Sequence, residues 1–280
     1  MFMCGHFMGP RECLRQMDLQ LDGKRALVSG STAGIGYAIA EALAREGARV
    51  IVNGRTKARV DAAIQKLDVS GVKGKVEGFA ADLGTSGGVN QIAAQYPEVE
   101  ILVNNLGIFE PKPFDQIPDA DWFRFFEVNV LSGVRLSRQY LPRMKERGWG
   151  RIVFISSESA LQIPAEMIHY GMTKTAQLAI SRGLAETTVG TNVTVNTVLP
   201  GPTESEGVAT FVEQMAAARK VSREEVEKEF FRSVRPSSLL RRFARVDEVA
   251  ALVAFVCSPL SSATNGAALR ADGGVVRAIV

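Results

Sequence analysis

The sequence predicts an α/β fold in which a doubly wound parallel sheet of about seven strands is covered by helices on both faces. Short apolar segments alternate with amphipathic helical segments along the chain, which is typical of a parallel sheet with helical crossovers. The 280 residues are 46% hydrophobic and 22% charged, a composition typical of one globular domain of this class. The first apolar segment runs directly into a glycine-rich turn, as in sheets that bind a ligand at the carboxyl ends of their strands.

The strands are recognised as short runs of Val, Ile and Leu that are bounded by polar residues or glycine. Runs such as RALVS and EILVN are continuously apolar, which indicates strands that are buried on both faces. Pro142 lies inside the longest expected helix and is a candidate kink point. In chain order, strands are expected at residues 25–29, 49–53, 75–80, 100–104, 151–156, 192–199 and 267–270, and helices at residues 37–46, 57–67, 120–147, 169–188 and 246–257.

Residues 203–242 interrupt this alternation, because they show an amphipathic helical pattern and no strand. Ser222 and Glu225 have the spacing of a capping box that opens a helix. An insertion after the sixth strand lies above the carboxyl edge of the sheet, so we interpret residues 203–242 as a helical lid over a substrate. The alternative is a surface hairpin that serves only packing. Residues 17–280 are expected to form one domain.

Charge and composition exclude several classes of function. The formal net charge is +3, and no basic stripe is present, so nucleic acid is not an expected partner. No apolar run approaches the roughly 20 residues that a membrane helix needs, so no membrane association is expected. The three cysteines are few and odd in number, which argues against a disulfide framework and favours a cytoplasmic location.

Residues 1–16 are expected to be a disordered extension rather than a secretory signal, because glycines and Pro10 interrupt their apolar run. Cys4, His6 and Cys13 lie in this extension and could be read as metal ligands. A fourth ligand is missing, so no metal site is predicted.

A glycine loop follows the first expected strand and opens the first helix. Gly30, Gly34 and Gly36 have the spacing G-x-x-x-G-x-G. Glycines let a pyrophosphate approach the backbone closely, and the N-terminus of the following helix offers free N–H groups and a positive dipole end. The loop therefore predicts a dinucleotide site. The alternative is a glycine turn that only packs the helix on the strand.

The end of the second expected strand bears on the choice of dinucleotide. Many dinucleotide folds place an acidic residue here for the ribose hydroxyls of NAD, but this chain has Arg55, with Lys57 close behind. A guanidinium matches the extra phosphate of NADP, so NADP is favoured over NAD. The alternative for Arg55 is a solvated surface residue. Asp82, at the end of the third strand, is a candidate acceptor for the adenine amino group.

Four polar residues form the candidate catalytic group. Tyr170 and Lys174 are separated by four residues and share one face of a helix, where the ammonium favours the phenolate and makes Tyr170 a candidate general acid and base. Ser157 ends the fifth strand and could hold a substrate oxygen, with Ser156 as a weaker competitor. Asn129 is unfavourable in mid-helix, so it either holds a water or backbone group or faces solvent.

Taken together, these motifs resemble the short-chain dehydrogenase/reductase family in its single-domain branch, whose sheet is of the Rossmann type. The resemblance runs from about Leu19 to Gly274 and includes GSTAGIG, NNLG, YGMTK, LPGPT and DGG, although Leu106 stands where the family usually has Ala. It implies that Asn129, Ser157, Tyr170 and Lys174 are a catalytic tetrad, with a water at Asn129 that relays protons through Lys174. It also implies, together with the loop and strand arguments, a cofactor set of Gly30, Ser31, Thr32, Gly34, Ile35, Gly36, Arg55, Asp82, Leu83, Asn105, Gly107, Tyr170, Lys174, Pro200, Gly201 and Thr203.

The sequence thus predicts an NADP-dependent oxidoreductase that transfers a hydride between the nicotinamide and a small carbonyl or secondary alcohol substrate. One alternative is an NAD-linked alcohol or sugar dehydrogenase. Another, from a different class, is a nucleotide-binding scaffold without turnover. The resemblance further implies a homotetramer or homodimer, and the apolar VVRAIV terminus fits a subunit contact.

Overall fold

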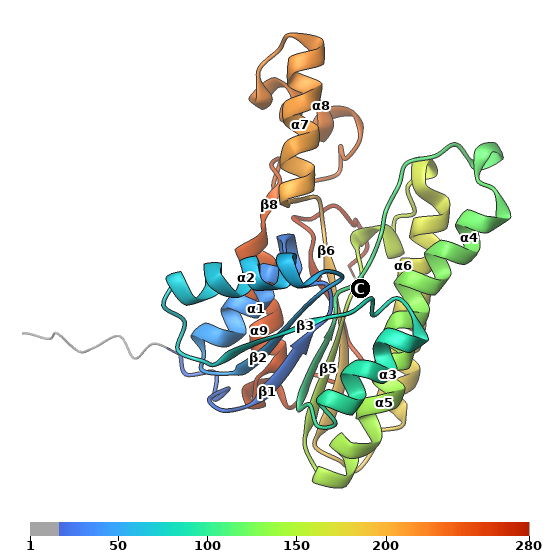
Figure 1. The fold of residues 1–280 in the computed structure, drawn as a ribbon. Coiled ribbons are helices and arrows are strands. Elements are labelled where there is room, and N and C mark those ends of the chain that lie inside the picture. Colours follow the sequence, from blue (N-terminus) through green and yellow to red (C-terminus); the bar gives the residue numbers. More distant parts are fainter. Residues whose placement is uncertain (1–16, 280) are drawn as a thin grey trace, which may run out of the picture.

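A computed structural model describes residues 17–279 and contains a seven-stranded, fully parallel sheet (Figure 1). The strand order β3-β2-β1-β4-β5-β6-β9 reverses direction between β1 and β4, which opens a crevice at the carboxyl ends of these strands. The predicted fold class is confirmed. Residues 1–16, with Cys4, His6 and Cys13, lie outside the described part of the chain. The strands are β1 (Arg25–Val28), β2 (Arg49–Gly54), β3 (Val76–Ala80), β4 (Ile101–Asn104), β5 (Gly150–Ile155), β6 (Val193–Pro200) and β9 (Ala268–Ala271).

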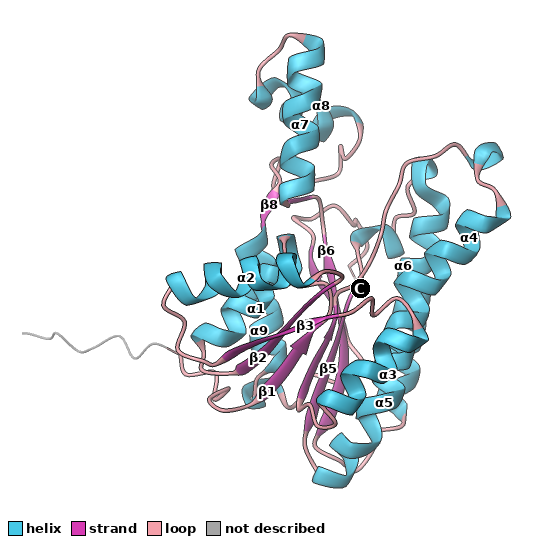
Figure 2. Ribbon diagram, in the orientation of Figure 1, coloured by secondary structure: helices cyan, strands magenta, loops and turns pink. Residues whose placement is uncertain are grey.

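Helices cover both faces of the sheet (Figure 2). One face carries α1 (Gly34–Arg45), α2 (Lys57–Val69) and α9 (Val246–Cys257). The other face carries α3 (Ser86–Gln95), α5 (Ser132–Arg147) and α6 (Ile168–Glu186). In residues 17–279, no helix is both long enough and apolar enough to cross a membrane.

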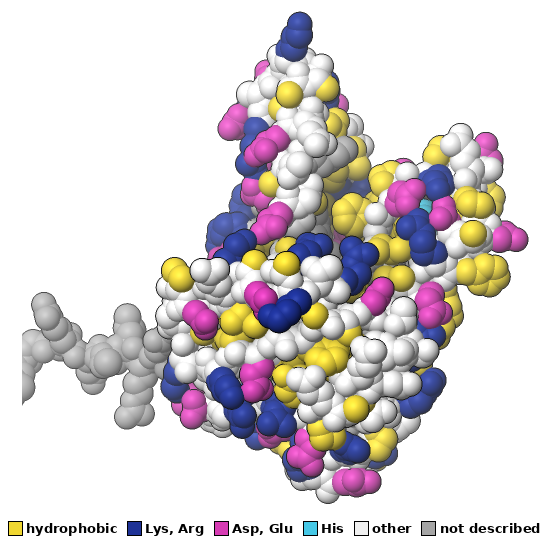
Figure 3. Space-filling view, viewed as in Figure 1, with side chains coloured by type: hydrophobic (Ala, Val, Ile, Leu, Met, Phe, Trp, Pro, Cys, Tyr) yellow, Lys and Arg dark blue, Asp and Glu magenta, His cyan; other side chains and the backbone are white. Residues whose placement is uncertain are grey.

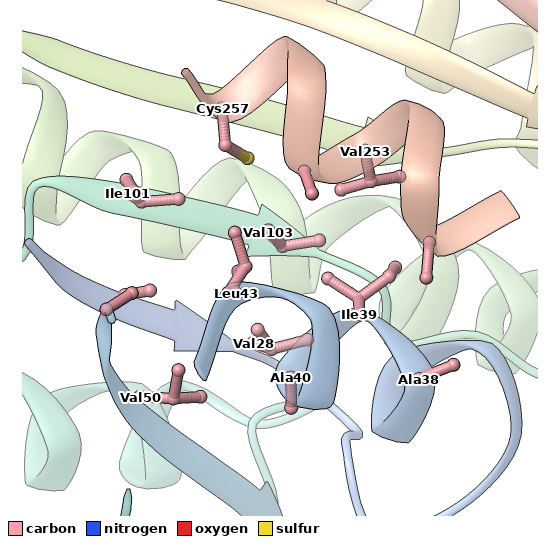
Figure 4. Close-up of a cluster of buried hydrophobic side chains, with 14 of the residues drawn as sticks. Val28, Ala38, Ile39, Ala40, Leu43, Val50, Ile101, Val103, Val253 and Cys257 are labelled. Atoms are coloured by element: carbon pink, nitrogen blue, oxygen red, sulfur yellow. The ribbon is translucent and has the colours of Figure 1, made fainter. Parts of the chain in front are cut away.

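Alternation along the central strands divides the apolar residues between two cores. Val28 and Val103 face Leu43 of α1 and Val253 of α9 (Figure 4). Their neighbours Leu27 and Leu102 face the other way, into the core that α3, α5 and α6 cover. Burial on both faces explains why the strands have no polar alternation in the sequence.

The long helix expected at residues 120–147 is not one regular helix. It consists of α4 (Asp119–Phe126), a π-helical turn (Glu127–Leu131) and α5. The irregularity lies at this turn and not at Pro142, since α5 continues through Pro142. Pattern alone missed the turn because its residues keep the helical spacing of apolar side chains.

Residues 203–242 were expected to contain no strand, and this is wrong at one end. Strand β7 (Thr203–Glu204) pairs in parallel with β8 (Ala244–Arg245), so the two ends of the insertion are tied together. Strands of two residues are too short to show the alternation of apolar and polar side chains by which a strand is recognised in a sequence. Between them, α7 (Glu206–Arg219) and α8 (Arg223–Ser233) form a hairpin that stands beyond the carboxyl edge of the sheet (Figure 1).

The insertion has a local signal and a small core of its own. The capping box at Ser222 is confirmed, because its hydroxyl accepts from the Glu225 amide while the Glu225 carboxylate accepts from the Ser222 amide. Val212, Val226 and Phe231 are buried between the two helices. The hairpin is therefore a packed unit that the short sheet β7-β8 attaches to the body.

Candidate active site

Two cavities lie along the carboxyl edge of the sheet. The larger has a volume of about 680 Å³ and lies between the ends of β5 and α6 and the inner side of the insertion. The smaller, of about 290 Å³, lies between the glycine loop and the end of β2. Both are lined by Gly107 and Ile108, so they meet just after β4. An elongated ligand can therefore pass from one to the other.

Most of the predicted site residues line these two cavities, in two groups. The larger cavity is lined by Ile35, Asn105, Gly107, Ser157, Tyr170, Lys174, Pro200, Gly201 and Thr203. The smaller is lined by Gly30, Thr32, Arg55, Asp82, Leu83 and again Gly107. Four predicted residues line neither, namely Ser31, Gly34, Gly36 and Asn129.

The glycine loop is tightly built around its backbone. A Cβ on Gly36 would lie 2.4 Å from the Gly30 oxygen and from Asn105 Nδ2, so only glycine fits there. Gly30 has φ +63, which also favours glycine. Asn105 Nδ2 donates to the carbonyls of Ser29 and Gly30, each at 3.0 Å. The loop thus folds closely around glycines at the start of α1, as a loop that receives a phosphate group at a helix N-terminus does.

Ser31 has a different position from the one expected. Its side chain is fully buried and donates to the Val28 carbonyl at 2.6 Å. It also accepts from the Asn53 amide at 2.9 Å. The Ser31 side chain therefore holds the turn to β1 and β2 and leaves no hydroxyl for a ligand.

Two arginines line the smaller cavity. Arg55 follows β2, and Arg59 lies in the first turn of α2. Lys57 does not line this cavity, because its ammonium is exposed and pairs with Asp61 at 2.6 Å. Sequence reasoning missed Arg59, although its spacing of four residues from Arg55 was a usable signal. The carboxylate that lines this cavity, within the described chain, is Asp82.

Tyr170 and Lys174 lie in the first turns of α6 and both line the larger cavity. Lys174 Nζ is 5.6 Å from the centre of the Tyr170 ring and donates to the Ile155 carbonyl at 2.9 Å. Burial lowers the pKa of Lys174 to about 8. Burial also raises the pKa of Tyr170 to about 12, against a smaller lowering by a hydrogen bond with Ser157.

The expected lowering of the phenol pKa by Lys174 is therefore not found in this structure. Loss of water around the Tyr170 hydroxyl has the larger effect, and Lys174 is not among the groups that shift it. The same burial disfavours the protonated form of the Lys174 amine and so lowers its pKa. The site as it stands holds a phenol that keeps its proton.

The two serines at the end of β5 have separate contacts. Ser156 Oγ donates to the Lys174 carbonyl at 2.8 Å and so fixes the start of α6 to the sheet. Ser157 Oγ donates to the Glu158 carboxylate and accepts from the Ser159 amide at 3.1 Å. Of the two serines, it is Ser157 whose hydroxyl forms a hydrogen bond with Tyr170.

Asn129 lies in the π-helical turn behind Lys174 and is buried, which excludes the solvent-facing alternative. Its Nδ2 donates to the Ile108 carbonyl at 2.9 Å and to Thr173 Oγ1 at 3.0 Å, and its Oδ1 accepts from the Ile108 amide. Its main-chain carbonyl accepts from Gln177 Nε2 at 2.6 Å. Gln177 Oε1 in turn accepts from Lys174 Nζ at 3.4 Å. Sequence reasoning missed Gln177, which lies three residues after Lys174 on the same helix.

Sequence reasoning also missed a buried ion pair in the larger cavity. Arg235 follows α8, and its Nε donates to Glu158 Oε1 at 2.9 Å. Their side chains are 10% and 5% exposed. The two residues are 77 positions apart, so no local pattern in the sequence could join them.

Comparisons with known proteins agree with this geometry. Residues 24–216 match the model of the short chain dehydrogenase family. The chain is 54% identical to an uncharacterized oxidoreductase of Bacillus subtilis, YvaG, over 94% of this chain and 100% of that protein. It is 33% identical to a D-beta-hydroxybutyrate dehydrogenase of Cupriavidus necator, over 91% and 99%.

Among solved structures, the chain is similar to L-sorbose reductase of Gluconobacter frateurii complexed with NADPH and L-sorbose. The TM-score is 0.88, with 28% identity, over 94% of this chain and 100% of that one. The family match covers more than half of this chain, and the parallel sheet and the glycine loop are those that such a family needs. The chain therefore belongs to the short-chain dehydrogenase/reductase family and is an oxidoreductase that acts on a carbonyl or CH–OH group with a nicotinamide cofactor.

Proposed function

We propose that this enzyme is an NADP-dependent carbonyl reductase in which Tyr170 supplies the proton. One observation carries the proposal: Tyr170, Ser157 and Lys174 line the larger cavity beside the point where it meets the smaller one. The glycine loop and the two cavities, which share Gly107 and Ile108, fit a dinucleotide in an extended conformation. When bound, the reduced cofactor supplies a hydride to the carbonyl carbon.

The chain's own residues handle the oxygen of the substrate. Tyr170 donates its proton to that oxygen, and the high pKa that burial gives it keeps the proton available in the resting enzyme. Ser157 donates a second hydrogen bond to the same oxygen once its hydroxyl turns away from Glu158. Lys174 holds the ribose on the nicotinamide side.

Asn129 and Gln177 keep Lys174 in position. The Asn129 carbonyl and the Lys174 ammonium are joined by the amide of Gln177. The family resemblance implies a water at Asn129, and this water would lie next to the Gln177 amide. We therefore propose that protons reach Lys174 along a path beside Gln177.

A substitution at Tyr170 tests the catalytic assignment. We expect Tyr170→Phe to lower kcat at least about 1,000-fold, because it removes only the proton that must be transferred. NADPH binding, followed by the fluorescence of the dihydronicotinamide, should be unchanged. A variant that reduces a carbonyl panel at the wild-type rate would contradict the assignment, and a wild-type protein that binds NADPH without reducing any carbonyl would support a scaffold role.

The preference for NADP rests on the smaller cavity. Arg55 and Arg59 both line this cavity, and the proposal is that their guanidinium groups meet the adenosine ribose of the dinucleotide. Guanidinium groups bind a phosphate in a bidentate manner, whereas NAD has only hydroxyls at this position. The solved relative with NADPH bound is consistent with the preference.

Charge reversal tests this preference. We expect Arg55→Asp to lower the ratio of kcat/KM for NADPH over NADH by roughly 100-fold, because the aspartate repels the phosphate and can accept from ribose hydroxyls. Lys57→Asp is the matched control, because Lys57 is exposed, pairs with Asp61 and lies outside the cavity. An unchanged ratio in Arg55→Asp would remove the phosphate role and favour an NAD-linked alcohol or sugar dehydrogenase.

A further inference from the structure

The larger cavity is mostly apolar, and three of the six charged residues that line it are joined by ion pairs. Apolar side chains of the insertion form one wall, among them Val212, Met215 and Phe230. After β5, Glu158 lies beside Ser157 and pairs with Arg235, just after the end of the insertion's second helix. We call the charged group formed by Glu158, Glu166 and Arg235 the carboxylate cluster.

The charges in the carboxylate cluster do not balance. Arg235 Nε donates to Glu158 at 2.9 Å, and its Nη1 donates to Glu166 at 3.3 Å. One guanidinium thus serves two carboxylates, so the cluster carries a net charge of −1. Glu158 and Arg235 are buried, where water screens charge weakly, while Glu166 is about half exposed and counts for less.

The other cations that line this cavity do not compensate. Lys174 is held by the Ile155 carbonyl and Gln177, and under the proposed function it contacts the cofactor ribose. Arg219 lies on the insertion and is exposed to solvent, and Glu229, which also lines the cavity, is a partly exposed residue of opposite charge. Near Ser157, an incoming carboxylate would therefore be a third negative group around the single positive charge of Arg235.

A neutral oxygen is received differently. The Nη2 atom of Arg235 makes no hydrogen bond within residues 17–279, so the guanidinium has a donor to offer in the cavity that it lines. A ketone, ester or amide oxygen can accept from this donor without adding charge. The apolar side chains of the insertion then contact the apolar chain of the bound carbonyl compound.

We infer that the carboxylate cluster makes the cavity selective for neutral carbonyl compounds with an apolar chain, and that Glu158 is the residue that excludes carboxylates. This inference rests on the proposed function for the meaning of the cavity as a substrate site. The ion pair does not neutralise an anionic substrate, because the single positive charge of Arg235 is already offset by two glutamates.

The test uses two ligands that match in length and shape, octanamide and octanoate. Each is titrated calorimetrically into the full chain, with and without saturating NADP, at a pH where octanoate is ionised. We expect octanamide to bind at least about tenfold more tightly than octanoate, given the repulsion between charges that are weakly screened. Glu158→Gln has nearly the same shape and should reduce this preference at least about threefold.

Two more variants complete the design. Glu166→Gln should reduce the preference in the same direction by a smaller factor, and its half-exposed side chain keeps the test open if Glu158→Gln does not fold. Glu213→Gln makes the same change of charge on an exposed residue of α7 that does not line the cavity, and should leave the preference unchanged.

Equal binding of the two ligands, or binding of neither, would overturn the inference. A preference that survives both Glu158→Gln and Glu166→Gln would overturn the role of the cluster. These outcomes are distinct from a failure of the proposed function, since the titration needs no turnover. If octanamide is preferred but no carbonyl is ever reduced, the pocket inference stands and the reductase proposal falls.

Discussion

Burial shifts the pKa of several residues in or next to this site, and the neighbouring residues in the sequence do not reveal these shifts. His169, next to Tyr170, is fully buried between aromatic rings, with Phe125 at 4.0 Å and Trp122 at 6.0 Å between ring centres. Neither ring nitrogen of His169 has a hydrogen-bond partner within the described chain. Burial lowers its pKa, although Asp121 and Glu110 oppose this and Lys112 and Arg124 reinforce it.

This histidine predicts a dependence of stability on pH. In the unfolded chain the imidazole takes up a proton below about pH 6.5, whereas in the folded chain it resists protonation to a lower pH. The unfolded state then binds more protons, so His169 should reduce the free energy of unfolding by up to about 1.4 kcal/mol for each pH unit below 6.5. Urea unfolding between pH 7 and pH 5 measures the slope, and His169→Phe should flatten it. An equal slope in both proteins would contradict the prediction.

The residue scale also shows what the sequence could and could not predict. The positions of Tyr170, Lys174 and Ser157 beside one cavity were predictable, because two of them share a helix face and the third lies two residues after the end of β5. The partnership of Glu158 with Arg235 was not, because only the tertiary fold brings the end of α8 to the end of β5. The direction of the Tyr170 pKa was also missed, since it depends on how much water the folded site excludes.

At the scale of elements, the packing of α5 against the sheet depends on a close approach. Gly133 lies in the first turn of α5, and a Cβ there would come within 2.7 Å of the Phe154 ring in β5. Phe154 is fully buried between the layers and has no room to move away. The spacing between helix and strand is therefore set by a missing side chain.

Two identical substitutions should have opposite effects on stability. We expect Gly133→Ala to lower the free energy of unfolding by about 1 to 3 kcal/mol, because the new methyl group overpacks the contact with Phe154. Gly183→Ala, on the exposed side of α6 with nothing near its added Cβ, should raise it by up to about 1 kcal/mol. Denaturant melts of the two variants measure this difference. A stabilised Gly133→Ala protein would show that the layers are less tightly packed.

The bounds of helices and strands were well predicted where the spacing of apolar residues in the sequence matches the side of the element that is buried. Helix α9 was expected at its observed bounds, and the seven strands were each expected within about two residues. Helix α3 was not anticipated, because its sequence SGGVNQIAAQ begins with weak helix formers. Its start is instead set by Thr85, whose hydroxyl accepts from the Gly88 amide.

At the scale of the whole molecule, an apolar surface is left exposed around α4. Phe114, Phe123 and Phe126 are 63%, 75% and 40% exposed, and apolar side chains gather on the arm that carries α4 (Figure 3). Contiguous exposed apolar groups of this kind mark interaction sites. The chain end shows less than the sequence suggested, since Val275 and Val276 are buried within the chain and Ile279 is exposed.

We therefore expect an assembly of two or four chains, with contacts at α4 and at the chain end. Light scattering should give a multiple of 30.3 kDa for the full chain. Phe123→Glu and a chain that ends at Val276 should each shift the mass towards one copy, because they remove exposed apolar contacts. Val189→Glu, at a separate exposed position, should not change it. A single copy in the unaltered protein would refute the expectation.

The end of the chain is also bonded to the base of the insertion. The Gly273 carbonyl accepts from the amides of Leu239 and Leu240, and a Cβ on Gly201 would strike the Asp272 carbonyl at 2.5 Å. The last residues of the chain are thus in contact with the base of the insertion and with Gly201, which lines the larger cavity. A purification tag fused to the carboxyl terminus would lie a few residues from these contacts, so kinetic constants of such a fusion should be compared with those of a chain tagged at its amino terminus.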